Sequence, residues 1–443
     1  MSSLSRRDFF HSAAAATAVT AATLGFEQVA KASASERVRV AHVATGGRAA
    51  SLVSSFSANK EVEIVAVCDL DPSRLEKGVA TIEKVTGKKP RIEKDYRKLI
   101  DANDIDAVVV GTPDHWHALP TILACMNGKD VYVEKPDGHN IEEGRRMVAT
   151  AKKHNRIIQM GTQNRSAQRM FDAIEYIRSG ALGKCLFAKA WESAKQGSIG
   201  RPADSDPPPG IDYDLWLGSA PKRPFNVRRF HGHWRWFYDY GTGDLGNDGV
   251  HRLDMARWAL SAAVEAQGEA PLGMPTVISA VGGKWYFDDM QEWPDSLQVT
   301  YQYPGTTPKI LTYEMRVWAP YSYLGESEGA AVFGDKGYII IGNQRWRAFG
   351  PNNKDVQSGS GDYGDAAHVQ NFIDCVKSRK RPNADLETVG HPSSVLCHAG
   401  NVASRLGRTI KLDPVTETFI DDKEANELRT RPEYRKPYEL PNV

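Results

Sequence analysis

Two hydrophobic patterns alternate along the first third of the chain. Short, continuous apolar runs rich in valine and isoleucine are separated by longer stretches that have an apolar residue every three or four positions. Such runs predict strands buried on both faces, and the stretches between them predict amphipathic helices. Because these connections are right-handed, the pattern predicts a doubly wound parallel sheet of the Rossmann type. The predicted strands are 38–43, 63–69, 106–112, 130–134 and 156–161, and the predicted helices are 48–57, 72–85, 119–127 and 141–154.

After Arg165 the pattern changes. Between 276 and 349, β-rich runs follow one another with only turn residues between them, which is typical of an antiparallel sheet. We therefore expect an α/β fold in which a second α/β domain carries a large, mainly antiparallel open sheet. The predicted parts are a Rossmann domain at 35–165, a second domain at 166–412 and a tail at 413–443 that wraps the surface. Helices of the second domain are predicted at 170–179, 366–378 and 393–406, a strand at 186–191 and a loop at 197–212.

Residues 1–34 predict an export signal that is not part of the fold. Twin arginines at 6–7 precede an apolar, alanine-rich stretch at 13–26 and a small-residue cleavage site at 32–34. This order is typical of a Tat signal, and a frayed alanine-rich helix is the alternative. The apolar stretch is shorter than the ~20 residues that a membrane anchor needs. We expect export by the Tat machinery, a mature chain that starts near Ser35, and a periplasmic or otherwise exported location.

Composition excludes several classes of protein. The 443 residues include 56 Lys or Arg and 55 Asp or Glu, a formal charge of +1, whereas nucleic-acid binders usually carry a strongly basic face. With 41% hydrophobic and 25% charged residues, the chain does not resemble an acidic disordered protein. The five cysteines are scattered and form no C-x-x-C pair, so they predict neither a disulfide framework nor a zinc cluster.

The turn after the first predicted strand, at 44–49, is an imperfect match to the G-x-G-x-x-G pattern of dinucleotide-binding proteins. Gly46 and Gly47 allow the backbone to approach a pyrophosphate, and the start of the next helix favours its negative charge. Asp69 ends the second predicted strand, where an acid can bind a ribose 2′-hydroxyl. Since a carboxylate there repels a 2′-phosphate, NAD is favoured over NADP. The alternative for Asp69 is an N-cap of the helix that begins near Pro72.

Further candidate residues follow the third and fourth predicted strands, at the edge where open α/β sheets bind ligands. The third strand is followed by Thr112-Pro113-Asp114-His115-Trp116-His117, whose histidines suggest metal ligands. Residues two apart do not share a face, and no third ligand is close in sequence, so we expect no metal. The fourth strand ends in Glu134-Lys135-Pro136. The Lys135 ammonium can stabilise a developing alkoxide, and a solvated surface lysine is the alternative.

The segment 231–254 is the densest in polar and aromatic residues. A glycine-rich turn leads into an amphipathic helix with His251 in its first turn and with Asn247 or Asp248 as N-cap. A histidine at a helix start has a lowered pKa and can accept a proton near neutral pH. A capping histidine without chemistry is the alternative. The aromatic residues before the helix suit either a sugar ring or the core.

Together these residues resemble the Gfo/Idh/MocA family over about 36–412. The resemblance rests on Gly46-Gly47-Arg48, Thr112-Pro113-Asp114, Glu134-Lys135-Pro136 and Gly249-Val250-His251 with Asp254, and the Tat signal is similar to that of an exported branch. It implies a Rossmann domain followed by a domain whose open sheet faces the nicotinamide. It also implies bound NAD(P), a carbohydrate substrate and a homo-oligomer, a dimer or tetramer, formed through the sheet's outer face.

The resemblance also implies roles for individual residues. The family's catalytic lysine falls on Lys135 and its histidine on His251, but its usual aspartate falls on Asn247. An asparagine orients a hydroxyl and accepts no proton, so either His251 is the sole acid/base or Asp248 takes part. The residues expected at the cofactor are Gly46, Gly47, Arg48, Asp69, Thr112, Pro113, His117, Glu134 and Lys135.

We expect an NAD-dependent oxidoreductase that acts on a hydroxyl group of a sugar, polyol or glycoside. Export implies little free NAD around the protein, so the cofactor is expected to stay tightly bound and to be reoxidised in place. Two alternatives remain open. One is a glycoside hydrolase that uses transient sugar oxidation, and the other is a non-catalytic carbohydrate-binding protein.

Overall fold

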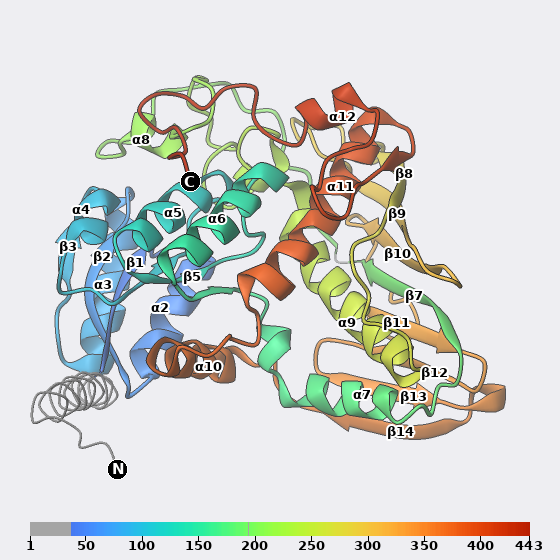
Figure 1. Cartoon of the computed structure of the whole chain (residues 1–443). Helices are drawn as coiled ribbons and strands as arrows, with labels where there is room; N and C mark the ends of the chain where they lie inside the picture. Colours follow the sequence, from blue (N-terminus) through green and yellow to red (C-terminus); the bar gives the residue numbers. More distant parts are fainter. Residues whose placement is uncertain (1–36, 194) are drawn as a thin grey trace, which may run out of the picture.

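The computed structural model describes residues 37–193 and 195–443, which form two sheets with helices packed between and around them (Figure 1). The predicted export signal lies outside the described residues. Within them, no helix has both the length and the hydrophobicity needed to cross a membrane.

The first sheet is built from six short strands. They are β1 (Val38–Val43), β2 (Val62–Cys68), β3 (Arg91–Glu93), β4 (Ala107–Val110), β5 (Asp130–Val133) and β6 (Ile158–Met160). All pair in parallel in the order β3-β2-β1-β4-β5-β6, so the strand order reverses between β1 and β4. The covering helices are α2 (Arg48–Ala58), α3 (Pro72–Thr86), α4 (Tyr96–Asp101), α5 (Ala118–Met126) and α6 (Ile141–His154). The predicted Rossmann sheet is confirmed, because strands such as β4 and β5 are buried on both faces.

Nine strands form the second sheet. They are β7 (Cys185–Glu192), β8 (Val277–Gly283), β9 (Ser296–Tyr303), β10 (Lys309–Arg316), β11 (Glu328–Gly334), β12 (Tyr338–Ile341), β13 (Arg345–Phe349), β14 (Asp355–Ser360) and β15 (Ile410–Lys411). The order is β14-β13-β12-β11-β7-β10-β9-β8-β15, and only β7 and β10 pair in parallel. The prediction of a large, mainly antiparallel sheet is therefore confirmed.

The remaining helices are α7 (Gln168–Arg178), α8 (Tyr213–Leu217), α9 (Val250–Ala266), α10 (Asp365–Ser378), α11 (His391–Leu406) and α12 (Lys423–Glu427). Helices α9 and α11 lie between the two sheets, α8 and α12 lie at the top of the view, and the outer face of the larger sheet is not covered by helices (Figure 1). Helix α9 packs on β7 and β11, and most of its residues are buried. This places the start of α9 beside the carboxyl edge of the first sheet.

Two segments of the second half of the chain return to the first domain. Helix α10, which the sequence placed in the second domain, packs on the first sheet beside α2, and Phe372 contacts Phe56 and Tyr132 with ring centroids 6.3 and 5.9 Å apart. The C-terminal tail crosses to α5, where Tyr438 packs edge-on against Trp116 at 5.4 Å. These contacts join the domains on both sides of the central crevice.

Candidate active site

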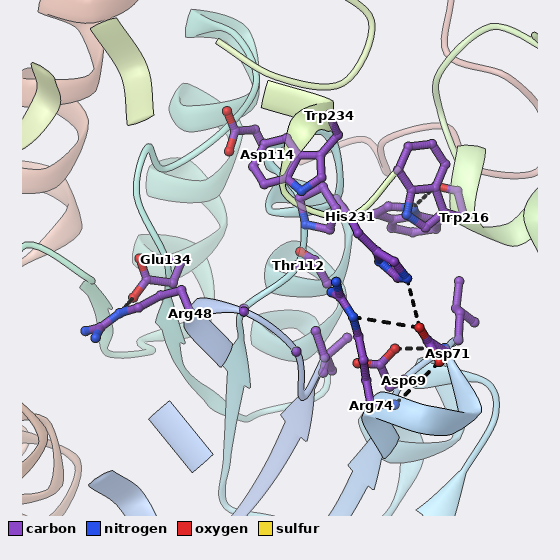
Figure 2. Close-up of a pocket in the computed structure, with 18 of the residues that line it drawn as sticks. Arg48, Asp69, Asp71, Arg74, Thr112, Asp114, Glu134, Trp216, His231 and Trp234 are labelled. Carbon is purple, nitrogen blue, oxygen red and sulfur yellow. Dashed lines mark hydrogen bonds and ion pairs between the residues drawn. The ribbon is translucent and has the colours of Figure 1, made fainter. Parts of the chain in front are cut away.

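A cavity of about 400 Å³ lies between the carboxyl edge of the first sheet and loops of the second domain (Figure 2). Its walls contain all of the cofactor residues predicted from the sequence, together with Asn247. His251 and Asp248 are not among the residues that line it. The predicted cofactor residues in its lining are Gly46, Gly47, Arg48, Asp69, Thr112, Pro113, His117, Glu134 and Lys135.

The turn between β1 and α2 leaves open space for a phosphate group. Gly47 has a φ of 56° and is the N-cap of α2, and no side chain caps the helix start. The backbone N–H groups of this first turn are therefore free of a capping side chain and favour an anion. A side chain at Gly46 would collide with Arg74, whose Cδ lies 2.3 Å from the added Cβ position. A side chain at Gly46 would therefore displace the flexible Arg74 side chain, whereas Gly47 is needed for its backbone conformation.

Asp69 is fixed at the end of β2 and is not a helix cap. One carboxylate oxygen accepts hydrogen bonds from the backbone N–H and the hydroxyl of Thr45, at 2.7 and 3.1 Å. The other accepts from the N–H of Asp71 at 2.9 Å. The N-cap of α3 is Asp71, which accepts from the N–H groups of Ser73 and Arg74. The N-cap alternative for Asp69 is therefore wrong, and its carboxylate is available to the cavity.

Arg48 lines the cavity, and its guanidinium binds other groups of the protein. It donates to Glu134 Oε1 at 3.1 Å (Figure 2) and to Asp365 Oδ1 at 2.7 Å. Burial disfavours the charged guanidinium, but Glu134 and Asp365 outweigh it and raise the pKa of Arg48 above its ordinary value. Arg48 therefore joins the edge of the first sheet to the start of α10.

Both histidines that follow β4 are bound to backbone carbonyls. The ring nitrogens of His117 lie 2.6 and 2.9 Å from the carbonyl oxygens of Pro136 and Thr112. Those of His115 lie 3.3 and 3.0 Å from the carbonyls of Tyr240 and Trp216. Since a neutral imidazole carries one N–H, each ring donates through one nitrogen to a backbone carbonyl, and the pair thereby helps to position the loop.

Lys135 and Asn247 meet at the inner end of the cavity. Lys135 Nζ donates to the backbone oxygen of Asn247 at 2.5 Å and to its side-chain Oδ1 at 3.3 Å. The amide nitrogen of Asn247 donates to Asp248 Oδ2 at 3.0 Å and to Asp244 Oδ1 at 3.4 Å. The ammonium of the first domain therefore faces the start of α9 in the second domain, with Asn247 oriented between two carboxylates.

His251 lies one helical turn after Asn247. It is buried, its Nδ1 has no hydrogen-bond partner among the described residues, and its ring lies 6.2 Å from that of Tyr363. Burial first, and then the charge of Lys135, hold the pKa of His251 well below its ordinary value. The imidazole is therefore neutral at physiological pH.

The predicted N-cap at Asn247 or Asp248 is wrong. A π-helical turn, Leu245–Gly249, runs continuously into α9, and Gly249 occupies the cap position without a side-chain hydrogen bond. The extra residue of a π turn changes the directions of successive side chains. Asn247 lies within this turn, where both its backbone oxygen and its side-chain oxygen accept from Lys135.

Three carboxyl groups lie together behind Asn247. Glu192, Asp244 and Asp248 each place an oxygen within 4.8 Å of the other two. Burial, together with the neighbouring Asp248, raises the pKa of Asp244 to about 6. Burial also raises the pKa of Glu192, whose Oε2 accepts from the hydroxyl of Tyr313 at 3.3 Å. Carboxyl groups this close do not all ionise, so this cluster retains a proton near neutral pH.

The second domain contributes cavity residues that the sequence did not identify, namely Trp216, His231 and Trp234 (Figure 2). They come from the long segment between β7 and α9. Arg74 of α3 was also missed, although its place in the first turn of the helix after Asp69 marks it as a neighbour. The second-domain residues could have been found only through the many aromatic residues at 231–240. Such a cluster does not indicate which of its rings face a ligand.

The described residues fit a dinucleotide. The turn at Gly46 and Gly47 and the uncapped start of α2 suit a pyrophosphate, and Asp69 suits a ribose hydroxyl. The side-chain hydroxyl of Thr112 is buried without a partner, as expected of a group that awaits a ligand. At the other end, Lys135 and Asn247 supply polar groups for a reacting substrate.

Comparison with known proteins agrees with this geometry at the level of the fold. A curated relative from Shewanella sp. strain ANA-3, named glycosyl hydrolase family 109 protein 1, is 30% identical over 159 residues. That match spans 35% of this chain and only 35% of the relative. The structure is similar to aldose-aldose oxidoreductase from Caulobacter crescentus, with 20% identity, a TM-score of 0.64, and coverage of 85% of this chain and 100% of that one.

A second solved structure of the same fold is the WlbA dehydrogenase from Bordetella pertussis in complex with NADH and UDP-GlcNAcA. It is 18% identical, with a TM-score of 0.63, and the match covers 85% of this chain and 98% of that one. Family comparison assigns residues 38–162 to the NAD-binding Rossmann fold of an oxidoreductase family and residues 189–440 to its C-terminal α/β domain. The chain therefore belongs to the Gfo/Idh/MocA family of oxidoreductases and is an NAD-binding enzyme.

Proposed function

We propose that this enzyme oxidises a hydroxyl group of a sugar, polyol or glycoside, with NAD held in the central cavity. One observation carries the proposal. Lys135 Nζ and Asn247 Oδ1 meet at the inner end of the cavity, with the neutral imidazole of His251 one turn further along α9. Oxidation of a hydroxyl group removes a hydride from its carbon and a proton from its oxygen. It needs a hydrogen-bond donor (Lys135), a hydrogen-bond acceptor (Asn247) and a group that takes up the proton (His251).

Bound NAD supplies the carbon that accepts the hydride. The remaining roles belong to the protein. Lys135 Nζ donates a hydrogen bond to the substrate oxygen and stabilises the negative charge that grows on it. Asn247 Oδ1 accepts a hydrogen bond from the substrate hydroxyl in the ground state and so orients the O–H bond. Because Nδ1 of His251 is enclosed, Nε2 is the nitrogen that accepts the proton when the C–O single bond becomes a carbonyl.

Asp248 takes part through Asn247. Its carboxylate accepts from the Asn247 amide, which fixes the side-chain oxygen of that amide toward Lys135. The acid that the family usually carries at position 247 is thereby displaced by one residue. In this arrangement Asp248 orients the substrate-binding amide, and His251 is the acid/base.

The test replaces Lys135 by methionine, which keeps most of the side chain and removes the charge. We expect turnover with glycosides or polyols to fall at least about 100-fold, as when an oxyanion donor is lost, while NADH still binds. His233→Ala, on a loop of the second domain, serves as the control because its side chain contacts Arg228 and no polar group of the first domain among the described residues. Turnover within threefold of wild type in the Lys135→Met protein would refute the assignment.

A second candidate is glycoside hydrolysis without net redox change, in which the sugar is oxidised, the substituent is eliminated and the carbonyl is reduced again. The observation that favours it is the 30% identity to the glycosyl hydrolase family 109 protein over about a third of each chain. Incubation with nitrophenyl glycosides distinguishes the two. Release of nitrophenol without accumulation of NADH supports hydrolysis, whereas a keto-sugar with stoichiometric NADH supports oxidation.

We further infer export by the Tat route, because twin arginines, an apolar stretch and a cleavage site occur in that order at 1–34. Cell fractionation tests this, and replacement of both arginines by lysine should leave the protein inside the cytoplasmic membrane. We also infer a homo-oligomer that uses the uncovered outer face of the nine-stranded sheet. Light scattering of the purified protein measures its mass directly.

A further inference from the structure

A loop of the second domain lies over one end of the dinucleotide cavity. We call residues 228–234 the lid loop, and four of them, Phe230, His231, Gly232 and Trp234, line the cavity together with Asp69. His231 Nε2 lies 2.8 Å from the Asp71 Oδ2 atom, across the boundary between the two domains (Figure 2). This contact closes the cavity at the end where Asp69 marks the ribose site.

Asp71 is a rigid partner for the lid loop. Its other oxygen accepts from Ser73 N–H at 2.8 Å as the N-cap of α3, so the helix fixes the carboxylate in place. Arg74 Nε lies 3.7 Å from the same oxygen that faces His231. The contact is therefore made to a group whose position and charge are set by the first domain alone.

The backbone of the lid loop is bent so that His231 points into the cavity. His231 has a φ of 38° and Gly232 a φ of 63°, two successive residues in the left-handed region. A histidine in this conformation costs free energy and persists only where other contacts hold it. Here the ring packs on Phe230, with centroids 3.8 Å apart, and Phe230 in turn packs on Trp216 at 5.1 Å.

Helix α8, which precedes the lid loop in the sequence, is held against the first domain by the C-terminal tail. Arg435 donates to the carbonyl of Gly218 at 2.9 Å and to Asp214 Oδ1 at 2.7 Å, so the tail holds α8 in place. The lid loop itself is held within the second domain, since Arg229 donates to the carbonyl of Pro224 at 2.8 Å and pairs with Asp204 at 3.2 Å. Among the described residues, the His231–Asp71 contact is the polar bond that joins this loop to the first domain.

We propose that His231 is a cofactor-retaining residue, and that a bound dinucleotide leaves only when the His231–Asp71 hydrogen bond opens and the lid loop moves away. This rests on the binding of NAD in the cavity but not on the substrate. A retained cofactor must be reoxidised where it is bound. The enzyme would then pass hydride between two substrates, or return it to the same one, instead of exchanging NADH for NAD at each turnover.

The charged groups that face His231 are Asp71, Asp69 and Arg74. Burial first, and then Arg74, lower the pKa of His231 below its ordinary value, and the two carboxylates only partly oppose this. At neutral pH the ring is therefore neutral, and the bond needs only its Nε2–H. It follows that cofactor release is insensitive to pH between about 7 and 9, and that a glutamine at position 231 can replace the donor.

The experiment measures cofactor release without catalysis. Full-length protein loaded with NADH is mixed with a large excess of NAD⁺, and the loss of bound-NADH fluorescence is followed in a stopped-flow instrument. His231→Ala should release NADH about 10- to 100-fold faster, as expected for a lost hydrogen bond to a charged group. His231→Gln should restore slow release in part. His233→Ala, on the same loop but without a partner in the first domain, should release at the wild-type rate.

Asp71→Ser provides a second route, because serine still caps α3 but its side chain is too short to reach His231. It should accelerate release as much as His231→Ala does. The proposal is overturned if His231→Ala and Asp71→Ser release NADH within twofold of wild type, or if His233→Ala accelerates release equally. Fast NADH release from the wild-type protein, together with normal turnover, would refute the role of the lid loop and leave the proposed reaction standing. Slow NADH release from the wild-type protein without turnover on any glycoside would refute the proposed reaction and leave the role of the lid loop standing.

Discussion

His391 makes the stability of the protein fall as the pH rises from 7 to 9. Its Nδ1 lies 2.6 Å from Asp137 Oδ2 and its Nε2 lies 2.9 Å from Glu417 Oε2, all in the buried space between α11 and the end of β5. Arg145 binds the same oxygen of Glu417 at 2.9 Å. Because Asp137 follows Lys135 by two positions, this pair also fixes the loop that carries the catalytic ammonium.

The size of the effect follows from the pKa. Burial opposes the charged ring, but Asp137 and then Glu417 outweigh it and raise the pKa of His391 from 6.5 to about 9. A raised folded-state pKa means that the stabilisation is complete below pH 6.5 and is lost as the pH rises through 9. At about 1.4 kcal/mol per pKa unit, the increase in the pKa of His391 corresponds to about 3 kcal/mol of unfolding free energy. The pKa of Asp137 is lowered, so its own contribution is lost only in acid, outside this range.

Urea unfolding followed by tryptophan fluorescence at pH 6, 7, 8, 9 and 10 measures this loss. The wild-type free energy of unfolding should fall by about 3 kcal/mol across the range. His391→Gln, which keeps hydrogen-bonding capacity but not the charge, should be less stable at pH 6 and nearly flat up to pH 9. Parallel curves for the two proteins would show that His391 is not charged in the folded state and would refute the reasoning.

Three further predictions concern the site. Asp69→Asn removes the charge that repels a 2′-phosphate and keeps an acceptor for Thr45, so NADPH binding measured by fluorescence should strengthen at least about tenfold. Burial and Asp248 raise the pKa of Asp244 to about 6, and its ionised carboxylate accepts a stronger hydrogen bond from the Asn247 amide than the protonated carboxyl does, so kcat/KM should fall as the pH drops below 6, and Asp244→Asn should abolish this limb. Asp254→Ala leaves the Arg165 guanidinium buried without its bidentate partner at 2.7 and 2.8 Å, which should cost about 3–5 kcal/mol of unfolding free energy. A loss below about 1 kcal/mol would contradict the last of these.

Much of the fold follows from local pattern. Strands β1, β2, β4, β5 and β6 were predicted because burial on both faces requires continuous apolar residues, and this shows in the sequence. Strand β14 was missed because nearly all of its residues are exposed, so it has neither an apolar run nor an alternating pattern. The short strand β15 was missed because two residues carry too little pattern to distinguish a strand from a loop.

The sequence alone also identified the dinucleotide-binding turn, Asp69 and Lys135. Each of them follows a predicted strand, and the carboxyl ends of parallel strands meet at one edge of the sheet. Contacts between residues far apart in sequence decided the rest. The Arg48 guanidinium binds Asp365, more than 300 positions away, instead of a phosphate. His231 reaches Asp71, and Lys135 meets Asn247 through a π turn that no local propensity predicts. Such contacts depend on how the two domains pack, and packing is a property of the whole core rather than of any one segment.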